Sequence, residues 1–318
     1  MSTCSTVSRE LDEPIAGTAA TARTWLLLEQ PGPWGAKALT SSHLDPALGR
    51  TLEAAAEGTG VRIALIRRPG RHADCGTSAA RQVYAAHTAP GSAWLHSATV
   101  DDPRALLDLD FAALGRGDQH TFDAALAGRP HTGGPLALVC TNGKRDRCCA
   151  LLGRPLAAEL AASGVEGVWE VTHLGGHRFS PTLLVLPYGY AYGRAQAHAV
   201  KEVLSDVQEG RIVVEGCRGS SAWERPGQAA ELAVRVAAHE YGADDLRVAA
   251  TSMEATSGAA PHWQVTVAHV DGRLWSVEVT QGASLPPRPE SCGTSVLGSP
   301  ARMEVVAVHE LRTAALTG

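Results

Sequence analysis

Three cysteines and two histidines lie close together near the middle of the chain. Cys140 ends an apolar run, and the adjacent Cys148 and Cys149 open a segment rich in Ala and Leu. Farther along, His173 and His177 enclose the tripeptide Leu-Gly-Gly. Thiolates and imidazoles are the ligands that zinc ions and iron–sulfur clusters take from proteins. These residue types at this spacing therefore predict a metal centre.

The predicted elements around these residues place each of them at the end of a strand or the start of a helix. A strand at 136–139 leads into the first cysteine, and a helix at 150–162 follows the cysteine pair, whose sulfurs then lie near free N–H groups and the positive end of the helix dipole. A strand at 167–172 precedes the histidines. There Gly175 and Gly176 let the backbone turn so that both imidazoles face one centre.

The other cysteines are scattered. Cys4, Cys75 and Cys292 stand alone in the sequence. An isolated cysteine commonly acts as a small buried apolar residue, and we predict that role for these three. The seven cysteines do not form the disulfide pattern of a small secreted domain. In a reducing compartment, closely spaced cysteines with histidines nearby indicate metal ligation or redox chemistry.

Hydrophobic runs and turn residues predict alternating strands and helices up to residue 208. Their order is that of a thioredoxin-like layer, a mixed sheet with helices on its faces, and it occurs twice. We therefore predict an α/β fold with two thioredoxin-like domains in tandem, at 1–130 and 131–225, the second carrying the metal centre. A small C-terminal α+β region follows at 226–318. The remaining predicted strands are 24–29, 61–66, 82–87, 93–100, 182–186, 262–270, 274–280 and 303–309, and the remaining helices are 45–57, 102–114, 195–208 and 227–243.

Two segments lack these signals. The polar N-terminal residues are expected to fray, and the Pro-, Ser- and Gly-rich segment 282–300 is expected to be a surface loop.

Composition excludes several classes of function. The net charge of −5 gives no support to a general nucleic-acid-binding role. No apolar run reaches the roughly 18 residues of a membrane helix, and the N-terminus does not resemble a secretory leader. We therefore expect a cytoplasmic protein that binds neither membranes nor nucleic acid.

Two cysteines and two histidines suit either a tetrahedral zinc ion or a [2Fe-2S] cluster in which two histidines replace two cysteines. The loop between Cys140 and Cys149 is longer than the short knuckles of most zinc ribbons, which favours the cluster slightly. A structural zinc protein remains an alternative. So does a thiol oxidoreductase that uses Cys148 and Cys149 or a neighbouring thiol, although adjacent cysteines suit that chemistry poorly.

Four segments resemble the sucrase/ferredoxin-like family, in particular its actin-patch-distal-type thioredoxin-like ferredoxins: GTAATARTWLLLEQPGPWG, CTNGKRDRCC, VWEVTHLGGHRFSPTLLVLPYGYAYGR and CRGSSAWERPGQAAE. The resemblance implies a [2Fe-2S] cluster, and the register of Arg145 and Asp146 makes Cys149 the second thiolate, with Cys148 as the alternative. A further departure is Cys217, which stands where the resemblance leads us to expect tyrosine. The implied ligands are Cys140, Cys149, His173 and His177.

On this resemblance the protein is an electron-transfer protein rather than an enzyme, with unidentified redox donor and acceptor proteins as partners. No carboxylate pair suits glycoside hydrolysis. An oxidised cluster with two thiolates and two neutral imidazoles has no net charge. It should therefore accept an electron more easily than a plant-type ferredoxin, whose potential is about −400 mV. If the far imidazole nitrogens reach solvent, electron transfer should also be coupled to protons.

Overall fold

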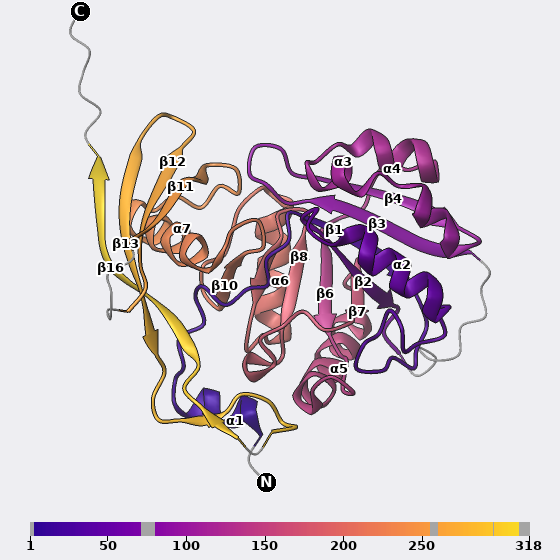
Figure 1. Cartoon of the computed structure of the whole chain (residues 1–318), viewed down its shortest axis with the longest axis horizontal. Helices are drawn as coiled ribbons and strands as arrows, with labels where there is room; N and C mark the ends of the chain where they lie inside the picture. The colour runs from indigo at the N-terminus through magenta and orange to yellow at the C-terminus, as the bar shows by residue number, and fades with distance from the viewer. Residues whose placement is uncertain (1–2, 71–79, 255–259, 295, 312–318) are drawn as a thin grey trace, which may run out of the picture.

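A ten-stranded mixed sheet runs through the molecule (Figure 1). Its strands are β1 (Thr24–Glu29), β2 (Val61–Arg67), β3 (Arg81–His87), β4 (Trp94–Val100), β5 (Arg129–Pro130), β6 (Leu136–Cys140), β7 (Val168–Val171), β8 (Leu183–Leu186), β9 (Tyr190–Tyr192) and β10 (Cys217–Ser220). Their order across the sheet is β10-β9-β8-β6-β7-β2-β1-β3-β4-β5. This computed structural model describes residues 3–70, 80–254, 260–294 and 296–311, so Cys75 lies outside the described residues.

Helices pack around this sheet, and a second sheet lies beside it. The α-helices are α1 (Cys4–Glu10), α2 (Pro46–Ala56), α3 (Phe111–Gly115), α4 (Gln119–Leu126), α5 (Arg147–Ala162), α6 (Ala197–Gln208) and α7 (Arg225–Ala238), with the 3-10 turns η1 (Pro103–Asp108) and η2 (His177–Phe179). The second sheet is antiparallel, in the order β11 (Leu246–Glu254), β12 (His262–His269), β13 (Leu274–Ala283) and β16 (Ala301–Leu311). The protein is thus a mixed α/β protein.

The large sheet joins the two regions that the sequence predicts as separate domains. β2 and β7 pair antiparallel through only two positions, Ile66 with Val171 and Arg67 with Glu170. At this seam Arg67 and Glu170 form a buried ion pair with 2.7 Å between Nη2 and Oε2. Thr141, just after β6, also donates to Glu170 Oε2 at 2.8 Å. A buried charge is retained at low cost only when it is paired and hydrogen-bonded, so this network fixes how the two halves meet.

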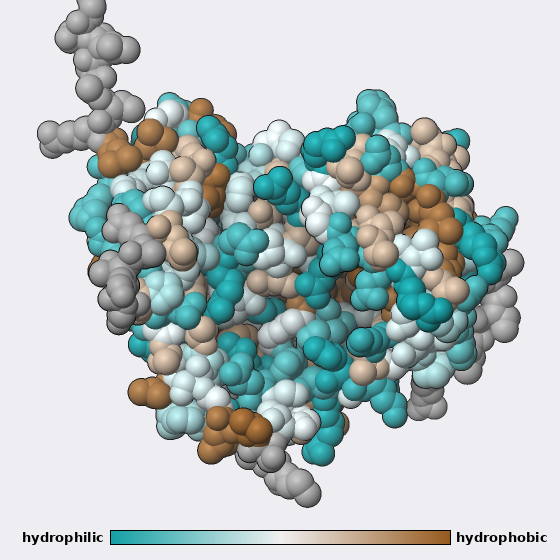
Figure 2. Space-filling model, viewed as in Figure 1, coloured by the Kyte–Doolittle hydropathy of each residue, from teal (hydrophilic) through white to brown (hydrophobic). Residues whose placement is uncertain are grey.

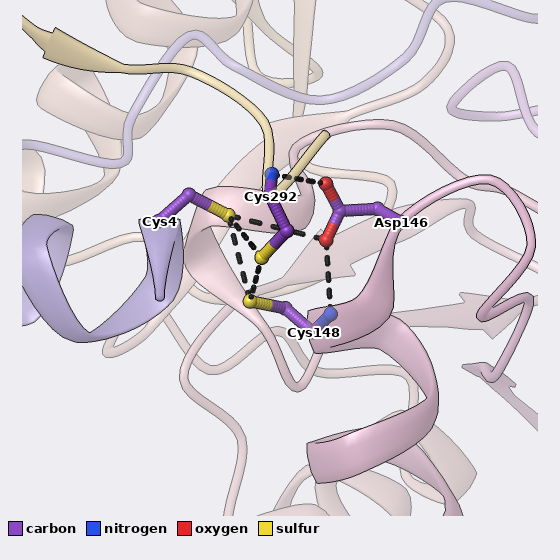
Figure 3. Close-up of side chains that lie close together, drawn as sticks. All are labelled: Cys4, Asp146, Cys148 and Cys292. Atoms are coloured by element: carbon purple, nitrogen blue, oxygen red, sulfur yellow. Dashed lines mark hydrogen bonds between the residues drawn. The ribbon is translucent and has the colours of Figure 1, made fainter. Parts of the chain in front are cut away.

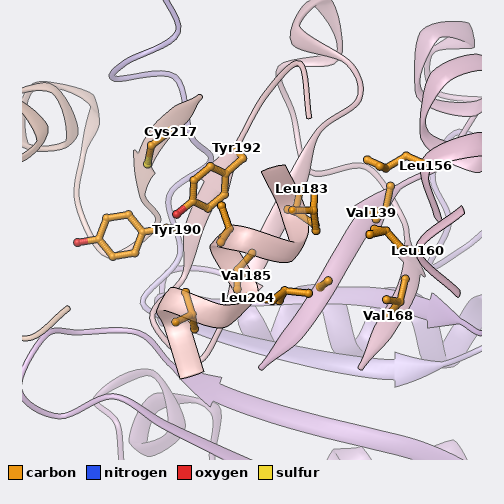
Figure 4. Close-up of a cluster of buried hydrophobic side chains, with 14 of the residues drawn as sticks. Val139, Leu156, Leu160, Val168, Leu183, Val185, Tyr190, Tyr192, Leu204 and Cys217 are labelled. Atoms are coloured by element: carbon orange, nitrogen blue, oxygen red, sulfur yellow. The ribbon is translucent and has the colours of Figure 1, made fainter. Parts of the chain in front are cut away.

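Alternation along β6 divides the core into two layers. Ala137 and Val139 face α5 and α6 in a cluster that includes Leu156, Leu160 and residues of α6 (Figure 4). Leu138 and Cys140 point to the opposite face. There they pack with residues of β1, β2 and β3, namely Trp25, Leu27, Ala64, Ile66, Tyr84 and Ala86.

α5 lies unusually close to the end of β6. It starts at Arg147, with Asp146 as N-cap accepting from the Cys148 N–H at 2.9 Å. Two turns into the helix, Gly153 faces the backbone of Cys140, and a Cβ there would overlap the Cys140 carbonyl oxygen. The absence of a side chain at Gly153 therefore allows the first turn of α5 to lie over the carboxyl end of β6.

The N-terminal helix lies beside a segment from the C-terminal region of the chain. Residues 284–294, called here the C-terminal strap, leave β13 and contain β14 (Arg288–Pro289), which pairs with β15 (Leu297–Gly298). In Figure 1 the yellow strap lies beside the indigo α1. The expected frayed N-terminus is thus wrong for residues 4–10, which form α1 and pack against η2 and this distant segment. The expected surface loop at 282–300 likewise contains β14 and β15.

A second departure concerns the helix predicted at 102–114. The structure divides it into η1 and α3, and the break falls where Asp110 caps α3 by accepting from the Ala113 N–H at 2.9 Å. An aspartate in this position competes with continued helix by offering a side-chain cap.

The surface has no extended apolar face in the view of Figure 2, where the brown areas are small and separate. Exposed large apolar side chains are scattered, for example Leu151 on α5 and Leu285 in the strap. Among the residues that the structure describes, no helix combines the length and apolar composition needed to cross a bilayer.

We predict that Gly153→Ala lowers the free energy of unfolding by about 2 kcal/mol. Better helix propensity contributes about 1 kcal/mol, but overpacking against a backbone carbonyl costs about 3 kcal/mol. Denaturant unfolding monitored by circular dichroism measures the difference. Gly134→Ala is the control, because its Cβ would meet only the end of the flexible Gln208 side chain. Equal stability of the two variants would show that the close approach is not a constraint.

Candidate metal centre

Cys140, Cys149 and His173 come together at the carboxyl end of β6. One ligand atom from each lies within 4.8 Å of the others. Both cysteines are fully buried, whereas His173 is half-buried. They come from a strand end, a helix start and the loop after β7, the three places that the sequence predicts. Three of the four predicted ligands therefore lie in one group.

The loop that carries the histidines is held by two arginines. Gly175 and Gly176 have φ angles of +82° and +69°, which side chains other than glycine adopt rarely. Arg218 donates to the Gly175 carbonyl at 3.1 Å, and a Cβ on Gly176 would overlap its guanidinium group. Arg62 donates to the His173 carbonyl at 3.0 Å. The glycines therefore provide both the turn and the space for the Arg218 side chain.

These arginines also place positive charge near the thiols. Arg218 is almost completely buried, and burial lowers its pKa to about 10, so the guanidinium stays charged at neutral pH. Burial likewise lowers the pKa of Arg62, while the negative charge of Cys140 opposes that change. One buried and one half-buried cation that interact with Cys140 favour an anionic sulfur there.

Cys140 and Cys149 share a proton. The hydrogen bond with Cys149 is the largest cause that lowers the pKa of Cys140 well below its usual value, against burial and with help from His173. The same contact, together with burial, raises the pKa of Cys149. This contact favours a thiolate at Cys140 over one at Cys149, and a bound metal would displace the proton of the second thiol.

His177 begins η2 and lies next to His173. The ring centroids are 5.5 Å apart and the rings are inclined by 33°. Its Nε2 lies 2.6 Å from the carbonyl oxygen of Glu290 in the strap. A carbonyl can only accept, so Nε2 carries the hydrogen and a neutral ring leaves a lone pair on Nδ1. His177 is outside the group of three, although its position beside His173 keeps it at the site.

The Nδ1 atoms of both histidines are buried and have no hydrogen-bond partner. Buried polar atoms normally have partners, and an unsatisfied one requires an explanation such as an ion that belongs at the site. His173 groups with the two cysteine sulfurs and His177 lies next to it, so these side chains together offer the nitrogen and sulfur donors of a thiophilic metal centre. The residues present therefore fit a metal-containing group.

Comparison with known proteins agrees with this geometry. The family model described as sucrase/ferredoxin-like matches residues 15–219, which include the whole site. The chain belongs to the sucrase/ferredoxin-like family. No curated protein and no solved structure was found to match it.

Cys148 faces away from this site toward two cysteines outside the family match. Its Sγ lies 3.5 Å from that of Cys4 in α1 and 3.0 Å from that of Cys292 in the strap (Figure 3). The hydrogen bond from Cys4, opposed by burial, lowers the pKa of Cys148 to about 5. The prediction that Cys4 and Cys292 are isolated apolar residues is therefore wrong. Only the extra thiol beside Cys149 hinted at this group in the sequence.

Asp146 lies between the two groups of cysteines. Its Oδ1 accepts from the Cys148 N–H at 2.9 Å, and its Oδ2 accepts from the Cys292 N–H at 3.0 Å. Burial would raise the pKa of Asp146, but these N–H groups and His177 lower it overall. Cys217 belongs to neither group and is buried in the core beside Tyr190 and Tyr192 (Figure 4).

A second buried carboxylate, that of Glu13, connects the N-terminal segment and the strap to the part of the chain that matches the family model, residues 15–219. Glu13 follows α1, and its Oε1 accepts from Arg178, the residue after His177, at 2.7 Å. Its Oε2 lies 3.0 Å from Nη2 of Arg288 in the strap. All three side chains are largely buried. Removing the negative charge of Glu13 would leave the guanidinium groups of Arg178 and Arg288 buried without a compensating charge, and this would lower the free energy of unfolding.

We predict that Glu13→Gln lowers the free energy of unfolding at neutral pH by about 3 kcal/mol. Burial raises the pKa of Glu13, but Arg178 and its hydrogen bonds lower it overall below 4.5. A lowered pKa means that the charged side chain stabilises the fold fully above pH 4.5, and that this contribution is lost as the pH falls through the folded-state value.

The measurement is urea unfolding of both proteins at neutral pH and at several values below 4.5. The difference between wild type and variant should shrink on acidification. Glu10→Gln, a change on the exposed side of α1, is the matched control and should alter stability little. A difference that stays constant with pH would contradict the role given to the Glu13 charge.

Proposed function

We propose that the protein is a [2Fe-2S] electron carrier whose cluster is held by Cys140, Cys149, His173 and His177. The observation that carries this proposal is the grouping of Cys140, Cys149 and His173, with His177 next to His173 and a buried Nδ1 without a partner on each histidine. A cluster with these ligands supplies a one-electron couple at a potential above that of all-cysteine clusters. Membership of the sucrase/ferredoxin-like family supports the same assignment.

The cysteine side and the histidine side of the proposed cluster would differ in their exposure to solvent. Cys140 and Cys149 are fully buried and exclude water from the thiolate side. The His177 side chain keeps 21% of its surface exposed, so the imidazole side is the nearer route for an electron to reach a partner. Arg62 and Arg218 fix the loop carbonyls and stabilise negative charge at the thiolates.

Several finer features are part of the same proposal. Each half of the large sheet would be a thioredoxin-like domain, and the protein would be of the actin-patch-distal type, acting in the cytoplasm between a redox donor protein and an acceptor protein. Lys144, Arg145 and Arg147 are exposed next to the site and would offer a basic rim to an acidic partner, but an ordinary solvated loop is the better explanation of these charges. Nε2 of His177 donates a hydrogen bond to the Glu290 carbonyl and does not exchange a proton freely with solvent. We therefore propose that electron transfer is not coupled to a proton at His177.

The positions of the side chains disfavour the two alternatives. A single structural zinc ion would require all four ligand atoms around one point, whereas His177 lies outside the group formed by the other three. A thiol oxidoreductase using the cysteine pair would require Cys148 and Cys149 to act together. Instead, the two side chains belong to different groups.

We expect protein purified without oxygen to be coloured and to contain iron and sulfide in equal amounts, because a [2Fe-2S] centre absorbs visible light and zinc does not. Absorption spectroscopy with iron and sulfide analysis measures this. Reduction by one electron should then produce a paramagnetic signal in electron paramagnetic resonance. Colourless protein containing only zinc would overturn the cluster assignment.

Replacing the two adjacent cysteines should have opposite effects. Cys149→Ala removes a proposed ligand and should abolish the visible absorption, while Cys148→Ala should leave iron content near normal. Iron analysis and the visible spectrum are the measurements, and Cys217→Ala controls for loss of a buried thiol elsewhere. The reverse pattern would assign the second cysteine ligand to Cys148 instead of Cys149.

A further inference from the structure

Three cysteines that are far apart in the sequence meet at the N-terminus of α5. Cys4 and Cys292 are 3.4 Å apart at Sγ, and Cys148 lies 3.5 Å from the first and 3.0 Å from the second. None of these cysteines forms a disulfide. The sulfurs face one another from α1, the first turn of α5 and the strap (Figure 3). Separate parts of the chain thus contribute one soft ligand each to a common point.

The spacing of these sulfurs is close to that of a tetrahedral zinc site. Zinc–sulfur bonds of about 2.3 Å separate two thiolates on one ion by about 3.8 Å. The observed separations are about 0.3 to 0.8 Å shorter, the shortest being that between Cys148 and Cys292, so an outward movement of the side chains would admit the ion. Cys292 is in the strap and only half-buried, so its side chain can make this adjustment.

Asp146 is placed to complete the coordination. Its ligand oxygen lies within 4.8 Å of all three sulfurs, and Oδ1 is 3.9 Å from the sulfur of Cys4. A carboxylate offers about four lone pairs, and the N–H groups of Cys148 and Cys292 together with the Ser291 hydroxyl use three of them. The fourth accepts from the Cys4 thiol at 3.9 Å, and it becomes available to a metal once that thiol loses its proton, while the other hydrogen bonds hold the carboxylate in place.

We propose that Cys4, Cys148, Cys292 and Asp146 form a second metal site that binds one zinc ion. Three thiolates select a thiophilic cation over magnesium or calcium, and four ligands from the protein leave the ion closed to substrate, as in structural zinc sites. Binding would displace the remaining thiol protons, and no electron transfer is involved. The site is separate from the cluster proposed above, and either could exist without the other.

The zinc ion would fasten α1 and the strap to α5. Cys4 and Cys292 lie outside the family match at 15–219, whereas Asp146 and Cys148 lie within it. The ion would thus join two added segments to the family core beside the strap carbonyl that contacts His177. Metal removal should loosen the strap and expose this region to proteolysis.

The test is a comparison of zinc and iron in the same set of full-length proteins. Each protein is treated with chelator under reducing conditions, given zinc(II) alone, desalted and analysed by mass spectrometry for zinc bound per chain, while iron is measured in untreated samples. The set is wild type, Cys4→Ser, Cys292→Ser, Cys149→Ala and the control Cys217→Ala. We expect one zinc ion per chain in wild type, Cys149→Ala and Cys217→Ala, and its loss in Cys4→Ser and Cys292→Ser.

Iron provides the internal check on folding. Cys4→Ser and Cys292→Ser should keep the iron content of wild type, so their loss of zinc would reflect a missing ligand and not unfolding. If no cluster is present in any protein, zinc-dependent thermal stabilisation replaces iron as the comparison: zinc should raise the melting temperature of Cys149→Ala but not of Cys292→Ser.

Cobalt(II) tests the ligand type in the same proteins. Bound to wild type, it should give the intense near-ultraviolet bands of thiolate coordination, and these should be absent from Cys292→Ser. Zinc that disappears in Cys149→Ala and persists in Cys292→Ser would overturn the proposal and assign zinc to the first site. It would be overturned equally if wild type bound no zinc, or if purified protein contained a disulfide between Cys148 and Cys292.

Discussion

The candidate centre depends on the contact between α5 and the end of β6. Gly153 lets the helix rest on the Cys140 carbonyl, and this contact brings the first turn of α5 over the strand end where Cys140 lies. A larger residue at that position would lift the helix and separate Cys149 from Cys140. The rest of the arrangement follows from this approach, since the histidine loop and the strap both pack around the N-terminus of α5.

Charge holds the remaining parts in place. Arg218 and Arg62 fix carbonyls of the histidine loop, while Glu13 joins Arg178 and Arg288 across three segments. Buried ions are costly unless paired and hydrogen-bonded, so such networks tolerate few alternative packings. The site therefore combines an apolar support, provided by the two core layers of β6, with a polar frame that sets the position of each ligand-bearing segment.

The sequence was sufficient to predict much of this arrangement. Local patterns gave every predicted strand to within three residues, because runs of buried side chains bounded by turns are local signals. They also placed Cys140, Cys149 and His173 on elements that the structure brings together.

Local patterns could not predict which segments far apart in the chain pair with each other. The two-residue seam between β2 and β7, the packing of α1 against η2 and the strap, and the meeting of Cys4 with Cys292 all depend on contacts between segments far apart in the chain. The ligand set itself, and the division of the chain at 130 and 225, stay predictions.

The strap has a consequence for the order in which the protein is completed. Translation proceeds from the N-terminus, and chains begin to fold while synthesis continues. Residues 140–177, which carry all four proposed cluster ligands, therefore leave the ribosome more than a hundred residues before Glu290 and Cys292. During that interval the His177 side of the site lacks its cover. Until the strap is in place, the site would lack the Glu290 contact and stay more open than it is in the complete chain.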